Sequence, residues 1–381
     1  MTGATVSTIS AAEALQLARA RELALRGRGR VSPNPLVGAV VLRDGRVVGE
    51  GWHEGPGTPH AEVGALREAG DDARGATVIC TLEPCSHHGR TPPCCDALIA
   101  AGVARVVIGC RDPHERGRAG GVAVLSAAGI DVVMAGDDEA DECREQNAPF
   151  ITHALTGLPL VTLKLAASLD GKVATAAGET RWISGPQSRA VVHRWRADAD
   201  AVAVGIGTAI ADDPELTARD VGDTVVRQPL RVVFDGQARL APQSALVRGA
   251  ASTPVVVFVA DDADPGRVAR LRQAHVEVVA LRGDRADRIR LALHALGERE
   301  VQSVLLEGGP ILAEAFLAAG AVDRVAWFVA PCLIGGTSAP GALGGPGLGP
   351  LASVPRLQGV AVARTGDDVL ITGRLRPLAV G

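Results

Sequence analysis

The chain has 381 residues, 47% of them hydrophobic and 22% charged, which is the composition of a folded α/β protein long enough for two domains. The formal net charge of −4 argues against a nucleic-acid-binding protein, and no apolar run approaches the roughly 18 residues of a membrane span. Seven cysteines without a disulfide-framework spacing, and no signal-peptide pattern, predict a cytoplasmic location.

The first half of the chain predicts alternating helices and strands. Ser10 and Glu13 have the spacing of a capping box, which predicts a helix to about Arg26. The turn Asp44-Gly45 predicts a hairpin with strands at 37–42 and 46–49. Further strands are predicted at 77–82, 104–109 and 130–134, and helices at 60–66, at 94–101 and between the last two strands. This alternation predicts an α/β sandwich with its site at strand ends and helix starts.

His60, Cys85 and Cys94 are candidate ligands for a zinc ion. Together they supply three ligands of a tetrahedral site, and a catalytic zinc keeps its remaining position for water. Glu62 follows His60 by two residues, on the first turn of the same predicted helix. Its carboxylate can take a proton from the zinc-bound water and pass it to a leaving amine. The pattern H-x-E…P-C…C is typical of zinc-dependent nucleobase deaminases.

A structural zinc site, or no metal at all, is the alternative interpretation. A structural site closes its coordination shell with a further cysteine or histidine. The candidates for that ligand are Cys95, His53, His87 and His88. Cys95 directly follows Cys94, and adjacent side chains rarely point into one tetrahedron. The catalytic site is therefore favoured.

Eight residues separate Cys85 from Cys94, so this loop leaves from one candidate ligand and returns to another. It carries His87, His88 and Arg90, which favour a phosphate or another acidic group on the substrate. A solvated polar loop is the alternative. Asn34 lies in the rigid turn 32–35, where its amide can recognise the donor and acceptor edge of a base.

The segment Thr156–Pro159 predicts a linker, and a second α/β domain with a largely parallel sheet follows it. Its strands are predicted at 160–166, 201–204, 230–234, 254–259, 276–280 and 301–306. Gly205–Thr208 and Glu307–Pro310 each follow a strand and precede a helix, where backbone amides can bind phosphates. Either segment alone favours a tight turn, and Ile210 stands where a dinucleotide fingerprint has its third glycine. The segment Gly335–Pro350 predicts a long surface loop without chemistry.

Lys164 and Lys172 are the only lysines of the chain, and tyrosine is absent. We interpret this as pressure toward GC-rich codons, under which a retained lysine indicates a role that arginine cannot fill. Lysine is a compact point charge, whereas arginine is a planar fork. The alternative is that both lysines persist by chance on a surface.

Three segments of the first half match a known family: 32–38 (SPNPLVG), 60–62 (HAE) and 81–94 (TLEPCSHHGRTPPC). They resemble the deaminase half of the bifunctional riboflavin-biosynthesis deaminase/reductase. The resemblance implies that His60, Cys85 and Cys94 bind one zinc ion per chain and that Glu62 moves protons. It also implies that Asn34 holds the pyrimidine, and that His53, His87 and Arg90 lie near the ribose phosphate. The family often has lysine where this chain has Arg90.

Five segments of the second half resemble the reductase half of the same family, in the same order: 164–171 (KLAASLDG), 182–185 (WISG), 204–208 (VGIGT), 211–219 (ADDPELTAR) and 306–310 (LEGGP). The resemblance implies a fold like dihydrofolate reductase and the cofactor NADPH. The implied cofactor-binding residues are Ala166, Trp182, Thr208, Asp212, Gly309, Pro310, Ile311, Leu312, Ala313, Glu314 and Ala315. The implied substrate-binding residues are Lys164, Thr180, Ser184, Arg196, Leu216, Arg219 and Glu307. The two arginines suit phosphate clamping, with surface salt bridges as the alternative.

The whole chain is thus expected to hold a cytidine-deaminase-like zinc domain at 1–153 and a dihydrofolate-reductase-like domain at 160–381. By resemblance it deaminates 2,5-diamino-6-(5-phosphoribosylamino)pyrimidin-4-one and then reduces the ribosyl group, giving 5-amino-6-(5-phosphoribitylamino)uracil. One alternative is a nucleic-acid base deaminase, which the net charge and the 2% aromatic content oppose. Another is a deaminase with an inactive reductase-like scaffold. The resemblance also implies a homo-oligomer, a dimer or tetramer, and no membrane or nucleic-acid partner is expected.

Overall fold

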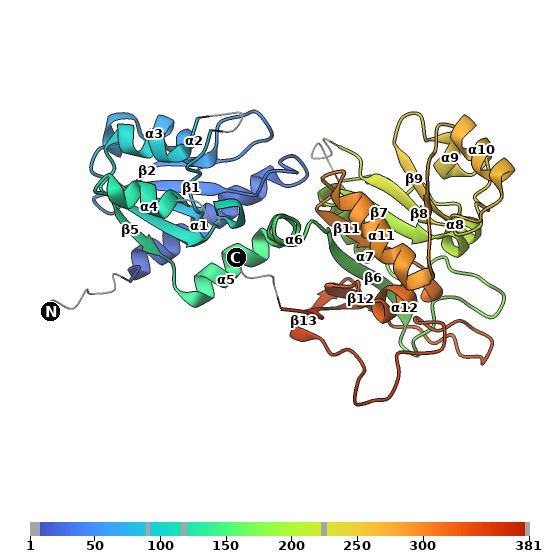
Figure 1. Cartoon of the computed structure of the whole chain (residues 1–381). Coiled ribbons are helices and arrows are strands. Elements are labelled where there is room, and N and C mark those ends of the chain that lie inside the picture. Colours follow the sequence, from blue (N-terminus) through green and yellow to red (C-terminus); the bar gives the residue numbers. More distant parts are fainter. Residues whose placement is uncertain (1–7, 89–91, 116–119, 222–226, 378–381) are drawn as a thin grey trace. The chain divides into compact units, whose positions relative to one another are not determined.

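The computed structural model describes residues 8–88, 92–115, 120–221 and 227–377 and divides them into two compact units (Figure 1). The first unit ends at Thr156, and the second runs from Gly157 to Pro377. Each unit contains one sheet, with helices packed against it. The α/β class and the two-domain organisation predicted from the sequence are confirmed.

The first unit is built on a five-stranded sheet with the order β2-β1-β3-β4-β5. Its strands are β1 (Gly38–Arg43), β2 (Arg46–Trp52), β3 (Thr77–Leu82), β4 (Arg105–Cys110) and β5 (Asp131–Met134). Its helices are α1 (Ala11–Ala24), α2 (Ala61–Ala69), α3 (Cys94–Ala101), α4 (Gly120–Ala127), α5 (Asp137–Gln146) and α6 (Ala148–Thr156). Strand β1 pairs antiparallel with β2 and β3, whereas β3, β4 and β5 run parallel. The carboxyl ends of these three strands therefore lie at one edge.

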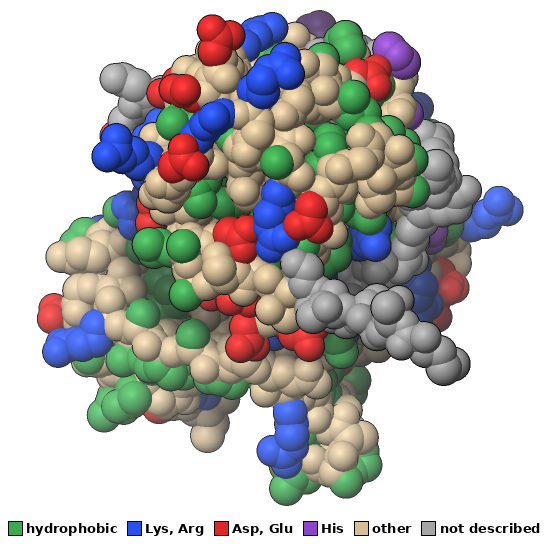
Figure 2. Space-filling model, turned by 90° about the vertical axis from the view of Figure 1, so that its left-hand side faces the viewer, with side chains coloured by type: hydrophobic (Ala, Val, Ile, Leu, Met, Phe, Trp, Pro, Cys, Tyr) green, Lys and Arg blue, Asp and Glu red, His purple; other side chains and the backbone are tan. Residues whose placement is uncertain are grey.

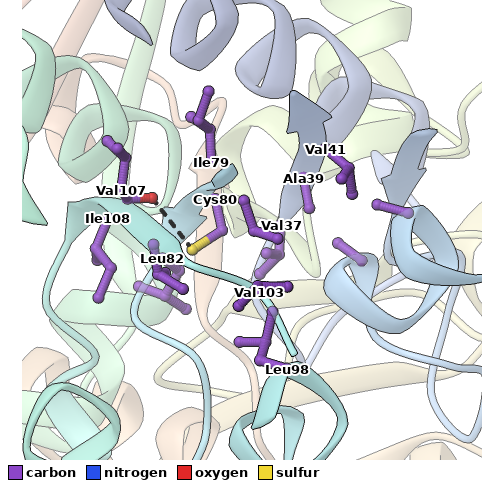
Figure 3. Packing of buried hydrophobic residues seen from close by; sticks show 14 of the residues in the cluster. Val37, Ala39, Val41, Ile79, Cys80, Leu82, Leu98, Val103, Val107 and Ile108 are labelled. Atoms are coloured by element: carbon purple, nitrogen blue, oxygen red, sulfur yellow. Dashed lines mark hydrogen bonds between the residues drawn. The ribbon is translucent and has the colours of Figure 1, made fainter. Parts of the chain in front are cut away.

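Aliphatic side chains from the strands and α3 form the core of the first unit (Figure 3). Figure 3 shows Ala39 and Val41 of β1, Ile79 of β3 and Leu98 of α3 in this cluster, and all four are fully buried. Close packing reaches the backbone at Gly38, where a Cβ atom would lie 1.9 Å from the carbonyl oxygen of Ala20. Helix α1 can thus rest directly on β1 only because residue 38 has no side chain.

The second unit is built on a nine-stranded sheet with the order β10-β9-β8-β7-β11-β6-β12-β14-β13. Its strands are β6 (Leu160–Ser168), β7 (Ala201–Gly205), β8 (Leu230–Phe234), β9 (Val255–Ala260), β10 (Glu277–Leu281), β11 (Ser303–Leu306), β12 (Arg324–Ala330), β13 (Gln358–Thr365) and β14 (Asp368–Arg374). Its helices are α7 (Pro186–Asp198), α8 (Ile206–Asp212), α9 (Ala245–Arg248), α10 (Pro265–Gln273), α11 (Arg285–Gly297) and α12 (Pro310–Ala318). All neighbours from β10 to β12 are parallel, and only β14 and β13 are antiparallel.

Both faces of the parallel sheet are buried, as its apolar strands predicted. Ala201 and Ala203 of β7 belong to a cluster with residues of α11 and α12. Val202 and Val204 point to the opposite face and pack with residues of α8, α9 and α10. Successive side chains of a strand point to opposite faces of the sheet. Half of each apolar strand therefore packs into the cluster on one face and half into the cluster on the other.

The sequence predictions agree best with the structure where an element is buried. The strands at 77–82 and 230–234 and the helix at 94–101 match their predicted bounds. The predicted start of the helix at 60–66 was wrong by one residue. His60 does not lie on the first turn of α2, because its backbone is extended, with φ −71° and ψ 162°, and it precedes the helix as the N-cap.

The sequence analysis also missed α5, α6, β12, β13 and β14. Helix α5 is rich in charged residues and buries only Ala140 and Cys143, so its apolar periodicity is weak. Strand β13 is exposed along almost its whole length. The segment Gly335–Pro350 is a loop, as predicted, but it is tied down, because the Lys172 ammonium donates to the carbonyl oxygen of Ala339 at 2.9 Å.

The surface drawn in Figure 2 interleaves basic and acidic side chains with apolar ones. This mixed pattern agrees with the small net charge of −4. Among the helices that the structure describes, none has the length and apolar character needed to span a membrane.

Replacing Gly38 with alanine is expected to destabilise the first unit by about 3 kcal/mol, because α1 must move away from β1. Gly64→Ala is the matched control. Gly64 lies within α2, and the nearest atom to an added Cβ would be 3.6 Å away, so this change should stabilise the unit by about 1 kcal/mol. Urea unfolding of both variants measures the difference. Equal unfolding midpoints would show that α1 is not held against β1 in this way.

Candidate active sites

Three side chains that are far apart in the sequence meet at the edge of the first sheet. Cys85 lies just beyond the end of β3, Cys94 is the first residue of α3, and His60 caps α2. The His60 Nδ1 atom lies 3.1 Å from Cys94 Sγ and 3.6 Å from Cys85 Sγ. All three ligand atoms lie within 4.8 Å of one another, and no other such group of His, Cys, Asp and Glu side chains occurs among the described residues.

The amino terminus of α3 stabilises a thiolate in this cluster. The backbone amide of Cys94 donates to Cys85 Sγ at 3.3 Å. Hydrogen bonds from Cys94, with the nearby His60 ring, lower the pKa of the Cys85 thiol to about 4. The pKa of Cys94 moves upward, because its thiol is the donor in that pair. A helix start favours a thiolate because the helix dipole stabilises negative charge there.

These donors fit a catalytic zinc ion better than a structural one. Two thiols and one imidazole are ligands that zinc prefers. The structure turns Cys95 away, because its thiol donates to the carbonyl oxygens of Pro84 at 3.5 Å and of Gly121 at 3.8 Å. No fourth ligand atom joins the cluster among the described residues. A position therefore remains for water.

Glu62 lies beside the three ligands in the first turn of α2, and it is only 3% exposed. Burial raises the pKa of its carboxyl group, and the thiol of Cys94 forms a hydrogen bond with it. The carboxyl group thus adjoins the ligands without belonging to the ligand group.

Asn34 and His53 meet next to the same cluster. The Asn34 Nδ2 and His53 Nε2 atoms are 2.9 Å apart. The His53 ring packs edge-on against the His60 ring, with 5.5 Å between the ring centroids. His53 is 4% exposed, and burial lowers its pKa.

The loop between the two cysteines is only partly described. His87 is half-buried and His88 is exposed. Arg90 lies outside the described residues. The phosphate-binding role inferred for this loop therefore stays a prediction.

In the second unit, two of the predicted substrate residues, Arg196 and Glu307, form a largely buried ion pair whose side chains are 13% and 10% exposed. The Arg196 guanidinium donates to both carboxylate oxygens of Glu307, at 2.6 and 2.8 Å. Although burial by itself raises the pKa of Glu307, the charge and hydrogen bonds of Arg196 lower it below its usual value. Burial lowers the pKa of the neighbouring Lys164 ammonium. Arg196 is thus committed to a largely buried carboxylate, whereas Arg219 pairs with Glu215 on the surface, so Arg219 is the more available of the two arginines for a phosphate.

The two glycine segments predicted separately come together, because β7 and β11 are neighbours in the sheet. A Cβ atom on Gly309 would lie 2.9 Å from Thr208 Oγ1, and one on Gly205 would lie 3.4 Å from the side chain of Leu312. The starts of α8 and α12 therefore adjoin one another with backbone amides that could hold a phosphate.

Several cofactor residues implied by the resemblance differ in accessibility. Ala313 and Ala315 are core residues, so any contribution they make to a cofactor site comes from the backbone. Trp182 and Ile311 are 68% and 61% exposed. The Arg189 guanidinium lies over the Trp182 ring, 4.4 Å from its centroid. Ala166 is half-buried on β6.

The loop after α8 carries two further predicted substrate residues, Leu216 and Arg219, and Thr180 and Ser184 lie between β6 and α7. Leu216 is 2% exposed and has φ 55°, a left-handed conformation that is costly for leucine. The Thr180 hydroxyl donates to Asp212 Oδ1 at 2.7 Å, at the start of this loop. Arg219 is exposed and pairs with Glu215. The Ser184 carbonyl oxygen accepts from Arg189 at 2.7 Å.

Two side-chain amides that hold the site loops were missed from the sequence. Asn147 accepts from the backbone amide of Leu36 and donates to its carbonyl oxygen, both at 2.8 Å. Gln228 does the same for Ala218, at 2.8 and 3.0 Å. Each side-chain amide bonds to the backbone of a loop as a neighbouring strand would. Each of these two loops carries a predicted substrate residue. No local pattern signals either residue, because the pairing depends on the fold.

Comparison with known families finds two matches along the chain. Residues 12–110 match the cytidine and deoxycytidylate deaminase zinc-binding region. Residues 159–371 match the RibD C-terminal domain.

Relatives match over almost the full length. The riboflavin biosynthesis protein RibD of Escherichia coli is 42% identical over 373 residues, covering 93% of this chain and 97% of the relative. The RibD of Mycobacterium tuberculosis is 41% identical over 350 residues, covering 91% and 92%. Among solved structures, RibD of Acinetobacter baumannii superposes with a TM-score of 0.84 at 37% identity, covering 95% of this chain and 98% of that one. A diaminohydroxyphosphoribosylaminopyrimidine deaminase/5-amino-6-(5-phosphoribosylamino)uracil reductase from Thermotoga maritima has a TM-score of 0.82 at 37% identity, with the same coverage.

Elemental analysis of the purified chain is expected to find one zinc ion per chain. Cys85→Ser should lose most of the metal, because it removes one of three ligands. Cys95→Ser is the matched control and should keep full zinc content, because that thiol bonds to backbone carbonyls instead. Equal zinc loss in both variants would contradict the ligand assignment.

Proposed function

The chain belongs to the RibD family of riboflavin-biosynthesis proteins, and from that membership we propose which residues catalyse its two reactions. It is a bifunctional enzyme with a zinc-binding deaminase unit and a reductase unit. We propose that both units act in turn on one phosphorylated pyrimidine, as the name of the Thermotoga maritima relative describes for that protein.

The first proposed reaction is hydrolytic deamination of 2,5-diamino-6-(5-phosphoribosylamino)pyrimidin-4-one. The observation that carries it is the cluster of His60, Cys85 and Cys94 with a buried Glu62 beside it. A zinc ion bound by these side chains would supply a water of lowered pKa. The Glu62 carboxylate takes a proton from that water and delivers it to the amino group as ammonia leaves. In this proposal Asn34 binds the pyrimidine, and His87 and Arg90 bind the phosphate group of the substrate.

The second proposed reaction reduces the ribosyl group to ribityl. NADPH would supply the hydride that C1′ receives. Its phosphates would lie against the paired glycine segments, with Thr208 and the start of α12 on either side. The adjacent Trp182, Asp212 and Ala166 would complete the cofactor site.

Lys164 and Glu307 are proposed to handle the proton that accompanies hydride transfer. Both residues are partly buried, the charge of Glu307 acts on Lys164, and Arg196 holds the Glu307 carboxylate in place. An amine whose pKa is lowered by burial gives up its proton more readily than an exposed lysine does. Arg219, in the loop beside Leu216, is the proposed phosphate ligand, with Thr180 and Ser184 nearby in the same unit.

The proposal also includes a location and an assembly state. A cytoplasmic location is supported by seven free cysteines. A homo-oligomer, a dimer or tetramer, is supported by the exposed edge strand β13, whose unpaired backbone groups could pair with another copy. No observation favours the nucleic-acid deaminase or the inactive scaffold as a second function.

Mass spectrometry of the diaminopyrimidinone phosphate tests both reactions in one tube. Wild-type protein should add about one mass unit on deamination and about two more when NADPH is present. Glu62→Gln should reduce ammonia release by at least about a hundredfold, because the amide cannot carry the proton. Its zinc content and its reduction of the deaminated substrate should match wild type. Ammonia release at the wild-type rate would disprove the role of Glu62.

Lys164→Arg is expected to slow the reductase step by about tenfold or more, because the planar guanidinium does not fit the buried site and stays protonated. Lys172→Arg is the matched control. The Lys172 ammonium only donates to the carbonyl of Ala339, which a guanidinium can also do, so this variant should keep full activity. NADPH oxidation with deaminated substrate is the measurement, and NADPH binding by each variant reports that the second unit is folded. Unchanged oxidation by Lys164→Arg would remove the argument for a lysine at this position.

A further inference from the structure

The turn that carries Asn34 is fixed before any substrate arrives. The backbone amide of Asn34 donates to the carbonyl oxygen of Val31 at 2.8 Å. Two residues further on, Leu36 is clamped on both sides by the buried amide of Asn147. The position of the Asn34 side chain is therefore set, and what remains is which end of its amide faces the substrate.

The partners of His53 decide that orientation. One ring nitrogen, Nδ1, faces the carbonyl oxygen of Pro59 at 3.4 Å, and a carbonyl can only accept. Nδ1 must then carry the proton of a neutral ring, which leaves Nε2 as an acceptor. The atom 2.9 Å from Nε2 is the amide nitrogen of Asn34, a donor. For a neutral ring, the two contacts therefore place the proton on Nδ1 and the Asn34 amide nitrogen against Nε2.

We propose that His53 is a positioning residue of the deaminase site, which turns the Asn34 amide so that Oδ1 faces the substrate. The Asn34 Oδ1 atom accepts no hydrogen bond from the described residues, whereas Nδ2 is engaged by His53. In this proposal His53 acts on the substrate through Asn34. This inference rests on the proposed deaminase function.

The orientation determines which pyrimidines can bind. An exposed amide oxygen accepts from an N–H group and repels a lone pair. The site should therefore prefer a base that presents a ring or exocyclic N–H at this edge, as the diaminopyrimidinone can. A base with only acceptors there would leave a buried oxygen unpaired, which is costly. Without His53 the amide could rotate, and this selection would weaken.

Two substitutions of His53 separate orientation from simple packing. His53→Phe keeps a ring but removes the acceptor, and it should raise the KM of ammonia release about tenfold, with a smaller change in kcat. His53→Gln offers an amide oxygen that Asn34 Nδ2 can donate to, so it should recover most of that loss. Zinc content and NADPH-dependent reduction by the full-length variants report that both units remain folded. A His53→Gln variant as impaired as His53→Phe would overturn the proposal.

A double substitution gives the sharper test. If His53 acts only through Asn34, then His53→Phe should cause no further loss in an Asn34→Ala background. If His53 binds substrate itself, the two losses in kcat/KM should multiply, and the proposal is then wrong. Wild-type protein that releases no ammonia from the diaminopyrimidinone phosphate would instead refute the proposed function.

Discussion

In both units the chemistry lies where parallel strands end. Neighbouring parallel strands bring their carboxyl ends to one edge of a sheet, whatever their distance along the chain. In the second unit β7, β11 and β6 are adjacent, so Gly205, Glu307 and Lys164 come from three distant segments to one region. In the first unit the loop after β3 delivers Cys85 to the start of α3. The order of strands thus fixes the sites more strictly than any single contact does.

Most of the metal site could be predicted from the sequence, because its residues lie in short segments with a recognisable pattern. The pattern uses three residue types at a specific spacing: His60, Glu62, Cys85 and Cys94. The clamps by Asn147 and Gln228 could not be predicted. Asn147 holds a residue 111 positions away, and an amide carries no signature of the backbone it will bind. The same limit applies to Arg196, whose partner Glu307 is also 111 positions distant.

The two sites balance charge in different ways. The deaminase cluster is made of soft ligands at helix starts, where backbone amides stabilise a thiolate. The reductase site instead buries a full ion pair with a second amine beside it. Burying charges in this way costs free energy unless each has a partner. The bidentate contact of Arg196 meets that requirement for Glu307, whereas burial lowers the pKa of the Lys164 ammonium.

The short connection at residues 157–159 joins two units that each bury a core of their own. A substitution at Glu62 therefore leaves the sheet around Lys164 intact, and the reverse also holds. Inactivating alleles of such a gene should then sort into two complementation groups, one for each half. A cell that carries one allele from each group would still possess both activities. Alleles that unfold the whole chain would belong to neither group.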